Sequence, residues 1–186
     1  MSVATRRHGD AATRRRAVFV DRDGVLVQAV QHGDWVHGPL ALEEFRLFAN
    51  IGEPIRKLRD AGFLIVLATN QPAIARGQLS WPTLEEMHRL LQEAVPLDAI
   101  KVCPHTDRDQ CDCRKPKPGL LLDAAEELHI DLPTSFFIGD TDRDVEAAKA
   151  AGVTPVLIDA PYNQSLPVNL RVKDLAEAAE AILKKP

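Results

Sequence analysis

Hydrophobic residues occur along the chain in short continuous runs, separated by stretches in which they recur at helical spacing. The continuous runs lie at residues 17–20, 63–68, 99–102, 135–138 and 154–158. Continuous apolar runs are typical of strands that are buried on both faces of a parallel sheet. Between them, apolar residues spaced three or four apart predict amphipathic helices. The alternation predicts an α/β fold, a Rossmann-like doubly wound parallel sheet with helices on both faces.

Residues with known preferences at helix ends mark the boundaries of the expected helices. Ser80 and Pro118 are expected to begin helices, and Gly62 and Gly152 to end them. Residues 25–48 break the regular pattern and are long for a connection in such a fold. We expect either a functional loop or a small hairpin there.

The composition is that of one ordinary globular domain. The chain has 186 residues, of which 45% are hydrophobic and 27% charged, which excludes a disordered chain, a coiled coil and a collagen. We expect a single domain over residues 17–186 without a large cap domain. Residues 1–16 are expected to form a flexible, Arg-rich tail, and a short nucleic-acid arm is the alternative reading.

Charge and hydropathy limit the partners. The net charge of −4 gives no general attraction for nucleic acid, so any anion must be bound locally. The chain has no run of about 18 apolar residues that could span a membrane. We therefore expect neither nucleic acid nor a membrane as a partner.

Polar residues follow directly on three of the predicted strands. Asp21, Thr69 and Asp140 each stand at the end of an apolar run. Ligands of open parallel sheets bind at the carboxyl ends of the strands, so these residues should converge. The same loops hold four further polar residues, Asp23, Asn70, Asp142 and Asp144. A buried carboxylate cluster needs a cation, and oxygen ligands suit Mg²⁺.

Each of these motifs also has an ordinary structural explanation. The pattern Asp21-Arg22-Asp23 could begin a loop or cap a helix. Thr69 could be a cap, and Asp140 could belong to an ordinary turn. Their joint occurrence, always after a strand, favours catalysis.

Phosphoryl transfer fits this set of residues. Asp21 is suited as the nucleophile, because a carboxylate needs no general base. Asp23 could protonate the leaving group and later activate water. Lys115 and Arg114 could hold the phosphate, with a hydrogen bond from Thr69. No glycine-rich Walker loop is present, so no nucleotide cradle is expected.

Three cysteines and a histidine lie close together in the sequence. Cys103, His105, Cys111 and Cys113 offer three thiolates and an imidazole, a four-ligand set for a structural Zn²⁺ site. The zinc would hold this loop in one conformation and bring Arg114 and Lys115 to the predicted active site. Buried free cysteines are the plain alternative, and a catalytic cysteine is a weaker one. Cysteines used in this way indicate a reducing compartment, so we expect the cytoplasm.

Four segments together resemble the motifs of the haloacid dehalogenase (HAD) superfamily of phosphatases. They are 19–26, which contains Asp21 and Asp23, 68–71, Lys115, and 139–144. The resemblance extends over residues 17–152. It implies Asp21 as nucleophile and Asp23 as acid and base. It also implies Mg²⁺ held by Asp21, the Asp23 carbonyl and Asp140, with Asp144 in support.

The cysteine loop is similar to one branch of this superfamily, which contains heptose 1,7-bisphosphate phosphatases and histidinol-phosphatases. Residues 69–77, which include Arg76 and Gly77, look like the heptose enzymes. The short interval between His105 and Cys111 looks like histidinol-phosphatase. The branch implies a sugar bisphosphate as the substrate, with histidinol phosphate or another small monoester as the alternative.

We expect a monomer that binds a small phosphorylated substrate, with contacts from Asn70, Gln71, Arg76 and Arg114. One cation suffices for the reacting phosphate, so the surplus of positive charge suggests a second anionic group on the substrate. Arg76 could instead point to solvent or hold its own loop. A receiver domain, which is a non-enzymatic phospho-aspartate module, is a remote alternative, because it carries its aspartate after the third strand.

Overall fold

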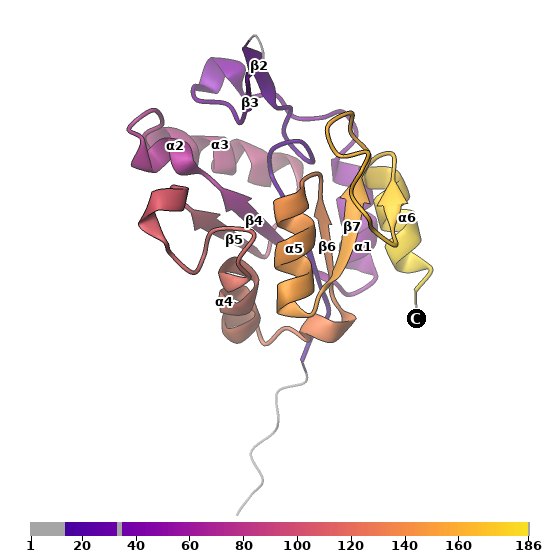
Figure 1. The fold of residues 1–186 in the computed structure, drawn as a ribbon. Helices are drawn as coiled ribbons and strands as arrows, with labels where there is room; N and C mark the ends of the chain where they lie inside the picture. The colour runs from indigo at the N-terminus through magenta and orange to yellow at the C-terminus, as the bar shows by residue number, and fades with distance from the viewer. Residues whose placement is uncertain (1–13, 33–34, 186) are drawn as a thin grey trace, which may run out of the picture.

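The computed structural model describes residues 14–32 and 35–185, whose centre is a six-stranded sheet in the order β5-β4-β1-β6-β7-β8 (Figure 1). Every neighbouring pair in this sheet is parallel. In chain order, the strands are β1 (Ala17–Val20), β4 (Leu64–Asn70), β5 (Ala99–Cys103), β6 (Phe136–Gly139), β7 (Thr154–Ile158) and β8 (Arg171–Val172). The predicted α/β class with a parallel sheet is confirmed.

Helices cover both faces of the sheet and divide the core in two (Figure 1). One hydrophobic cluster joins the sheet to three helices, α1 (Gly52–Asp60), α3 (Trp81–Ala94) and α6 (Leu175–Leu183). The second cluster lies on the opposite face, under α4 (Gly119–Leu128) and α5 (Asp142–Ala151). Alternate residues of β1 supply both clusters: Val18 and Val20 belong to the first, Ala17 and Phe19 to the second. This explains why the strand is apolar at every position.

A small antiparallel hairpin stands over the carboxyl edge of the sheet (Figure 1). It consists of β2 (Val30–His32) and β3 (Trp35–His37) and is followed by a short 3-10 helix, η1 (Leu42–Glu44). The irregular segment 25–48 thus contains the hairpin that was one of its two expected forms. The short helix α2 (Pro72–Ala75) lies on the same side of the molecule.

The remaining elements are short and were not predicted. They are α2, β8 and two further 3-10 helices, η2 (Asp107–Asp109) and η3 (Leu132–Thr134). Elements of two to four residues carry too little periodicity to be recognised in a sequence. No described helix is long and apolar enough to cross a membrane.

The expected N-terminal tail lies outside the described residues as far as residue 13. Its last residues are part of the fold. The amide of Arg15 donates to the carbonyl of His129 (3.0 Å), and its carbonyl accepts from the amide of Asp131 (2.9 Å). The guanidinium of Arg16 stacks 4.4 Å from the ring centre of Phe63. Regular pairing therefore begins just before β1.

Candidate active site

Three adjacent strands bring polar residues to one edge of the sheet. β1 lies between β4 and β6. Asp21 follows β1, Thr69 is near the end of β4, and Asp140 follows β6. All three are buried, with exposures of 8%, 1% and 4%. The parallel arrangement thus gathers side chains that are more than a hundred residues apart in the chain.

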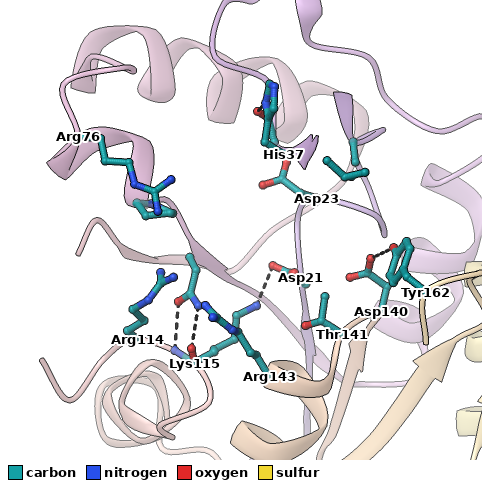
Figure 2. Close-up of a pocket in the computed structure, with 15 residues that line it drawn as sticks. Asp21, Asp23, His37, Arg76, Arg114, Lys115, Asp140, Thr141, Arg143 and Tyr162 are labelled. Atoms are coloured by element: carbon teal, nitrogen blue, oxygen red, sulfur yellow. Dashed lines mark hydrogen bonds and ion pairs between the residues drawn. The ribbon is translucent and has the colours of Figure 1, made fainter. Parts of the chain in front are cut away.

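Lys115 is the buried cation of this cluster. Its ammonium group lies 2.9 Å from Oδ1 of Asp21 and 2.6 Å from Oδ1 of Asp144, and it donates to the carbonyl of Ala68 at 2.9 Å. The side-chain amide of Asn70 holds the Lys115 backbone, accepting from its N–H (3.1 Å) and donating to its carbonyl (3.0 Å). Side chain and backbone are therefore both fixed, as Figure 2 shows for the backbone and for Asp21.

Asp144 is fully engaged by its neighbours. It stands in the first turn of α5, where its Oδ2 accepts from the amide (3.0 Å) and hydroxyl (2.6 Å) of Thr141. The same oxygen accepts from the amide of Asp140 at 3.2 Å. Oδ1 accepts from Lys115. Gly139 has no room for a side chain, because a Cβ would lie 2.3 Å from Cβ of Asp144. Asp144 therefore orients Lys115 and the start of α5.

The two carboxylate oxygens of Asp140 differ in their hydrogen bonding. Its Oδ2 accepts a hydrogen bond from the hydroxyl of Tyr162. Its Oδ1 is buried and has no hydrogen-bond partner among the described residues. Buried carboxylate oxygens are normally paired, so an unpartnered one points to a ligand. Ligand oxygens of Asp21, Asp140 and Asp144 lie within 4.8 Å of one another, close enough to hold one metal ion.

The local electrostatics favour a further cation. Burial raises the pKa of Asp21 to about 8, although the nearby Lys115 ammonium acts in the opposite direction. Burial and the neighbouring Asp144 carboxylate raise the pKa of Asp140 to about 6. The single ammonium group therefore does not balance the negative charge that these buried carboxylates carry when ionised. A divalent cation would supply the missing positive charge.

Asp23 is positioned by two buried side chains. The guanidinium of Arg22 forms a two-pronged ion pair with its carboxylate, at 2.9 and 3.0 Å. The amide of Gln71 donates to Oδ2 of Asp23 and to the hydroxyl oxygen of Thr69, both at 2.8 Å. A Cβ on Gly38 would lie 2.5 Å from Oδ2 of Asp23, so the segment after the β2–β3 hairpin packs directly on this carboxylate.

A pocket of about 510 Å³ is bordered by the side chains of Asp21, Asp23, Lys115 and Asp140. Arginines line one side of it (Figure 2). Arg76 is exposed, and its guanidinium makes no hydrogen bond or ion pair with the residues that the structure describes. Arg114 is held by Oδ1 of Asp107 (2.7 Å) and the carbonyl of His105 (3.1 Å). Arg143 lies 3.7 Å from the same Asp107 oxygen. The wall therefore carries a strong positive charge.

The cysteine loop forms a compact four-ligand cluster. Its sulfur–sulfur distances are 3.7 Å (Cys103 to Cys111) and 3.5 Å (Cys111 to Cys113). Nδ1 of His105 lies 3.6 Å from the sulfur of Cys103 and 3.3 Å from that of Cys113. An ideal tetrahedral zinc site has edges of about 3.8 Å between sulfurs and about 3.6 Å between sulfur and nitrogen. The described cluster is close to these dimensions.

Two of the residues expected to contact substrate also bind other residues of the site. Asn70 lines the pocket, and both ends of its side-chain amide are hydrogen-bonded to the backbone of Lys115. Gln71 is 3% exposed, and its side-chain amide is hydrogen-bonded to Asp23, Thr69 and Arg22. Both side chains therefore hold neighbouring residues of the site in place, and their contact with substrate stays a prediction. The other expected residues lie either at the sheet edge, on the pocket wall or in the cysteine cluster.

Three residues at the site were given no role from the sequence. Arg143 and Tyr162 line the pocket, and Arg22 is fully buried against Asp23. Arg22 and Arg143 each stand between two aspartates of a recognised motif. That position could have drawn attention to them. Tyr162, the single tyrosine of the chain, follows the strand 154–158, where a ligand-contacting loop is expected.

A parallel sheet with a lysine and strand-end aspartates at its carboxyl edge defines a class of hydrolase. A family model described as HAD-hydrolase-like matches residues 112–161. A relative from Pseudomonas aeruginosa is 36% identical over 181 residues, which cover 91% of this chain and 99% of the relative. The chain belongs to the HAD family of hydrolases, and its relatives there are phosphatases.

The particular relatives share one name. The Pseudomonas protein is a D-glycero-beta-D-manno-heptose-1,7-bisphosphate 7-phosphatase. So is a protein of Escherichia coli K12 that is 39% identical over 155 residues, 76% of this chain and 78% of the relative. A crystal structure of D,D-heptose 1,7-bisphosphate phosphatase from B. bronchiseptica, complexed with magnesium and phosphate, superposes with a TM-score of 0.79. It is 33% identical and covers 92% of this chain and 99% of that one.

Gly24 tests how tightly the Asp140 carboxylate is held. Its φ is +84°, and a Cβ would lie 2.1 Å from Oδ2 of Asp140. Gly62 has a φ of +89° and nothing within 4 Å of its Cβ position. Gly62→Ala should therefore cost only the left-handed strain, about 1–2 kcal/mol. Gly24→Ala should cost a further ~1–3 kcal/mol, because Asp140 must also move. Denaturant unfolding measures both, and equal losses would show that the carboxylate yields freely.

Proposed function

We propose that this protein is a Mg²⁺-dependent phosphatase that removes the 7-phosphate of D-glycero-D-manno-heptose 1,7-bisphosphate and leaves heptose 1-phosphate. The observation that carries the proposal is the cluster of Asp21, Asp140 and Lys115 at the end of a pocket with an arginine wall. The relatives with this name support the substrate.

The donor set fits a magnesium ion. Asp21, Asp140 and the backbone carbonyl of Asp23 would hold it, and the unpartnered Oδ1 of Asp140 supports this assignment. When bound, the ion would neutralise charge on the transferred phosphoryl group and help to orient it. The relative from B. bronchiseptica was crystallised with magnesium and phosphate.

The side chains of this chain can carry out both halves of the reaction. Oδ1 of Asp21 accepts from Lys115 and from the amide of Arg22, which leaves Oδ2 to attack phosphorus. As the bond from phosphorus to the ester oxygen breaks, Asp23 gives its proton to the leaving alkoxide. Asp23 then takes a proton from the water that attacks the aspartyl-phosphate. Orthophosphate leaves and the Asp21 carboxylate is restored.

Two further groups stabilise the phosphoryl oxygens. Lys115 reaches the cluster as a point charge, and Thr69 can donate its hydroxyl proton, because its oxygen already accepts from Gln71. Gln71 and Arg22 hold Asp23 in place for proton transfer. Most of the chemistry thus comes from residues whose positions are set by buried partners.

A zinc ion in the cysteine cluster would be structural. Cys103, His105, Cys111 and Cys113 supply all four positions of a tetrahedron, so none is left open for water. Arg114 and Lys115 follow the last cysteine directly. Fixing this loop would therefore fix both cations relative to the sheet edge.

The arginine wall supports a bisphosphate substrate. Arg76 and Arg143 are less occupied than Arg114, whose guanidinium already binds Asp107 and a backbone carbonyl. A second phosphate of the substrate could pair with these two side chains. Histidinol phosphate, which carries a cation at its other end, would be repelled by the same wall.

Asp21→Asn should abolish turnover while the protein stays folded, because the amide has the same shape but is not nucleophilic. Phosphate release from heptose 1,7-bisphosphate, followed with Mg²⁺ present, measures the loss. Asp142→Asn is the matched control, since Asp142 is an exposed carboxylate at the same edge. Retention of a tenth of the wild-type rate in Asp21→Asn would refute the nucleophile.

Elemental analysis should find about one Zn²⁺ per chain in the purified protein. Cys111→Ser should lose most of this zinc and lower the melting temperature by about 5 °C or more, because binding is coupled to ordering of the loop. Asp112→Asn, next to Cys111 and 99% exposed, should change neither. A zinc-free wild-type protein of full stability and activity would contradict the proposal.

Arg76→Ala should weaken the bisphosphate far more than a simple monophosphate ester, by ~1.5–3 kcal/mol in transition-state binding. The measurement compares kcat/KM of wild type and variant on heptose 1,7-bisphosphate, p-nitrophenyl phosphate and histidinol phosphate. Wild type should prefer the bisphosphate. Equal losses on both esters, or a preference for histidinol phosphate, would overturn the substrate assignment and leave the phosphatase chemistry standing.

A further inference from the structure

Tyr162 combines an exposed ring with an engaged hydroxyl group. It belongs to the loop between β7 and β8, and the residue is 59% exposed at the pocket. Its hydroxyl nevertheless donates to Oδ2 of Asp140. Exposed tyrosines usually leave the hydroxyl to water, so a bond to a buried carboxylate at the reaction centre calls for a physical reason.

The loop holds Tyr162 in this place through a buried asparagine. Asn163 is 1% exposed, and its amide donates to the carbonyls of Asp140 (2.7 Å) and Ile158 (2.8 Å). Its oxygen accepts from Arg171 at 2.9 Å, and Arg171 also donates to the carbonyl of Asn163 at 3.1 Å. Two successive residues of one loop thus bind both the backbone and the carboxylate of Asp140.

The hydrogen bond from Tyr162 makes the two carboxylate oxygens of Asp140 different from each other. Oδ2 is occupied by Tyr162, whereas Oδ1 is buried and unpartnered among the described residues. Figure 2 shows Tyr162 on one side of Asp140 and Asp21 on the other. Gly24 packs against the Oδ2 side, where a Cβ would lie 2.1 Å away. Rotation of the carboxylate is therefore restricted, and Oδ1 remains directed into the carboxylate cluster.

We propose that Tyr162 is a positioning residue, which fixes the Asp140 carboxylate so that Oδ1 is available to a divalent cation shared with Asp21. A carboxylate that is held by one oxygen binds a metal without first losing its rotational freedom. The proposal rests on the function proposed above. Its first readout is cation binding, which requires no turnover.

Tyr162→Phe tests the hydroxyl alone, because the ring is kept. Binding of Mn²⁺ to the zinc-loaded protein, followed by electron paramagnetic resonance of the free ion, should weaken about tenfold. The Mg²⁺ concentration for half-maximal activity should rise by a similar factor, while kcat at saturating Mg²⁺ stays within about threefold of wild type. Unchanged Mn²⁺ affinity in a folded Tyr162→Phe protein would overturn the proposal.

Gln164→Ala is the matched control for loosening of the loop. Gln164 is exposed, donates hydrogen bonds to Asp159 and Ala160 in the same loop, and makes no hydrogen bond to Asp140 in the described structure. Its Mn²⁺ affinity should equal that of wild type, and an equal loss in both variants would contradict a specific role of Tyr162. If wild type binds Mn²⁺ but hydrolyses no phosphate ester, the proposed function fails, and the comparison of affinities still decides the role of Tyr162.

Discussion

The ammonium group of Lys115 lies between the carboxylates of Asp21 and Asp144 and is almost fully buried. A buried ion pair of this kind gains little net stability, because both partners lose their hydration. Its value is geometric. The ion pair fixes a cation against Asp21, the proposed nucleophile, and joins the end of β1 to the start of α5 across the sheet edge. Asn70 holds the backbone of the lysine through two further hydrogen bonds.

The charge balance of this cluster explains much of the remaining site. Lys115 faces three aspartates, and burial raises the pKa values of Asp21 and Asp140. Oδ1 of Asp140 is a buried oxygen of this cluster that has no hydrogen-bond donor among the described residues. Chemistry and selectivity are then separated in space. The residues proposed to react stand at strand ends with buried partners, whereas the arginines that line the pocket come from surrounding loops and from the first turn of α5.

The sequence predicted those parts of the fold and site that depend on local pattern. Asp21, Thr69 and Asp140 could be placed together because each ends an apolar run in a parallel sheet, and the resemblance to HAD phosphatases pointed to the same residues. The hydrogen-bond partners of the site's side chains were harder to predict from the sequence. The sequence did not show that Asn70 binds the backbone of Lys115 or that Gln71 binds the carboxylate of Asp23, because these contacts join segments that are far apart in the chain. Tyr162 is brought to Asp140 by a loop that has no periodic pattern.

A crystal structure grown with Mn²⁺ and orthophosphate would test the proposed site most directly, because anomalous scattering locates the metal. We expect one Mn²⁺ between Asp21 and Oδ1 of Asp140, with the hydroxyl of Tyr162 still on Oδ2 and a phosphate oxygen within hydrogen-bond distance of the Lys115 ammonium group. A metal ion bound elsewhere, or a phosphate that lies away from Asp21 and Lys115, would contradict it.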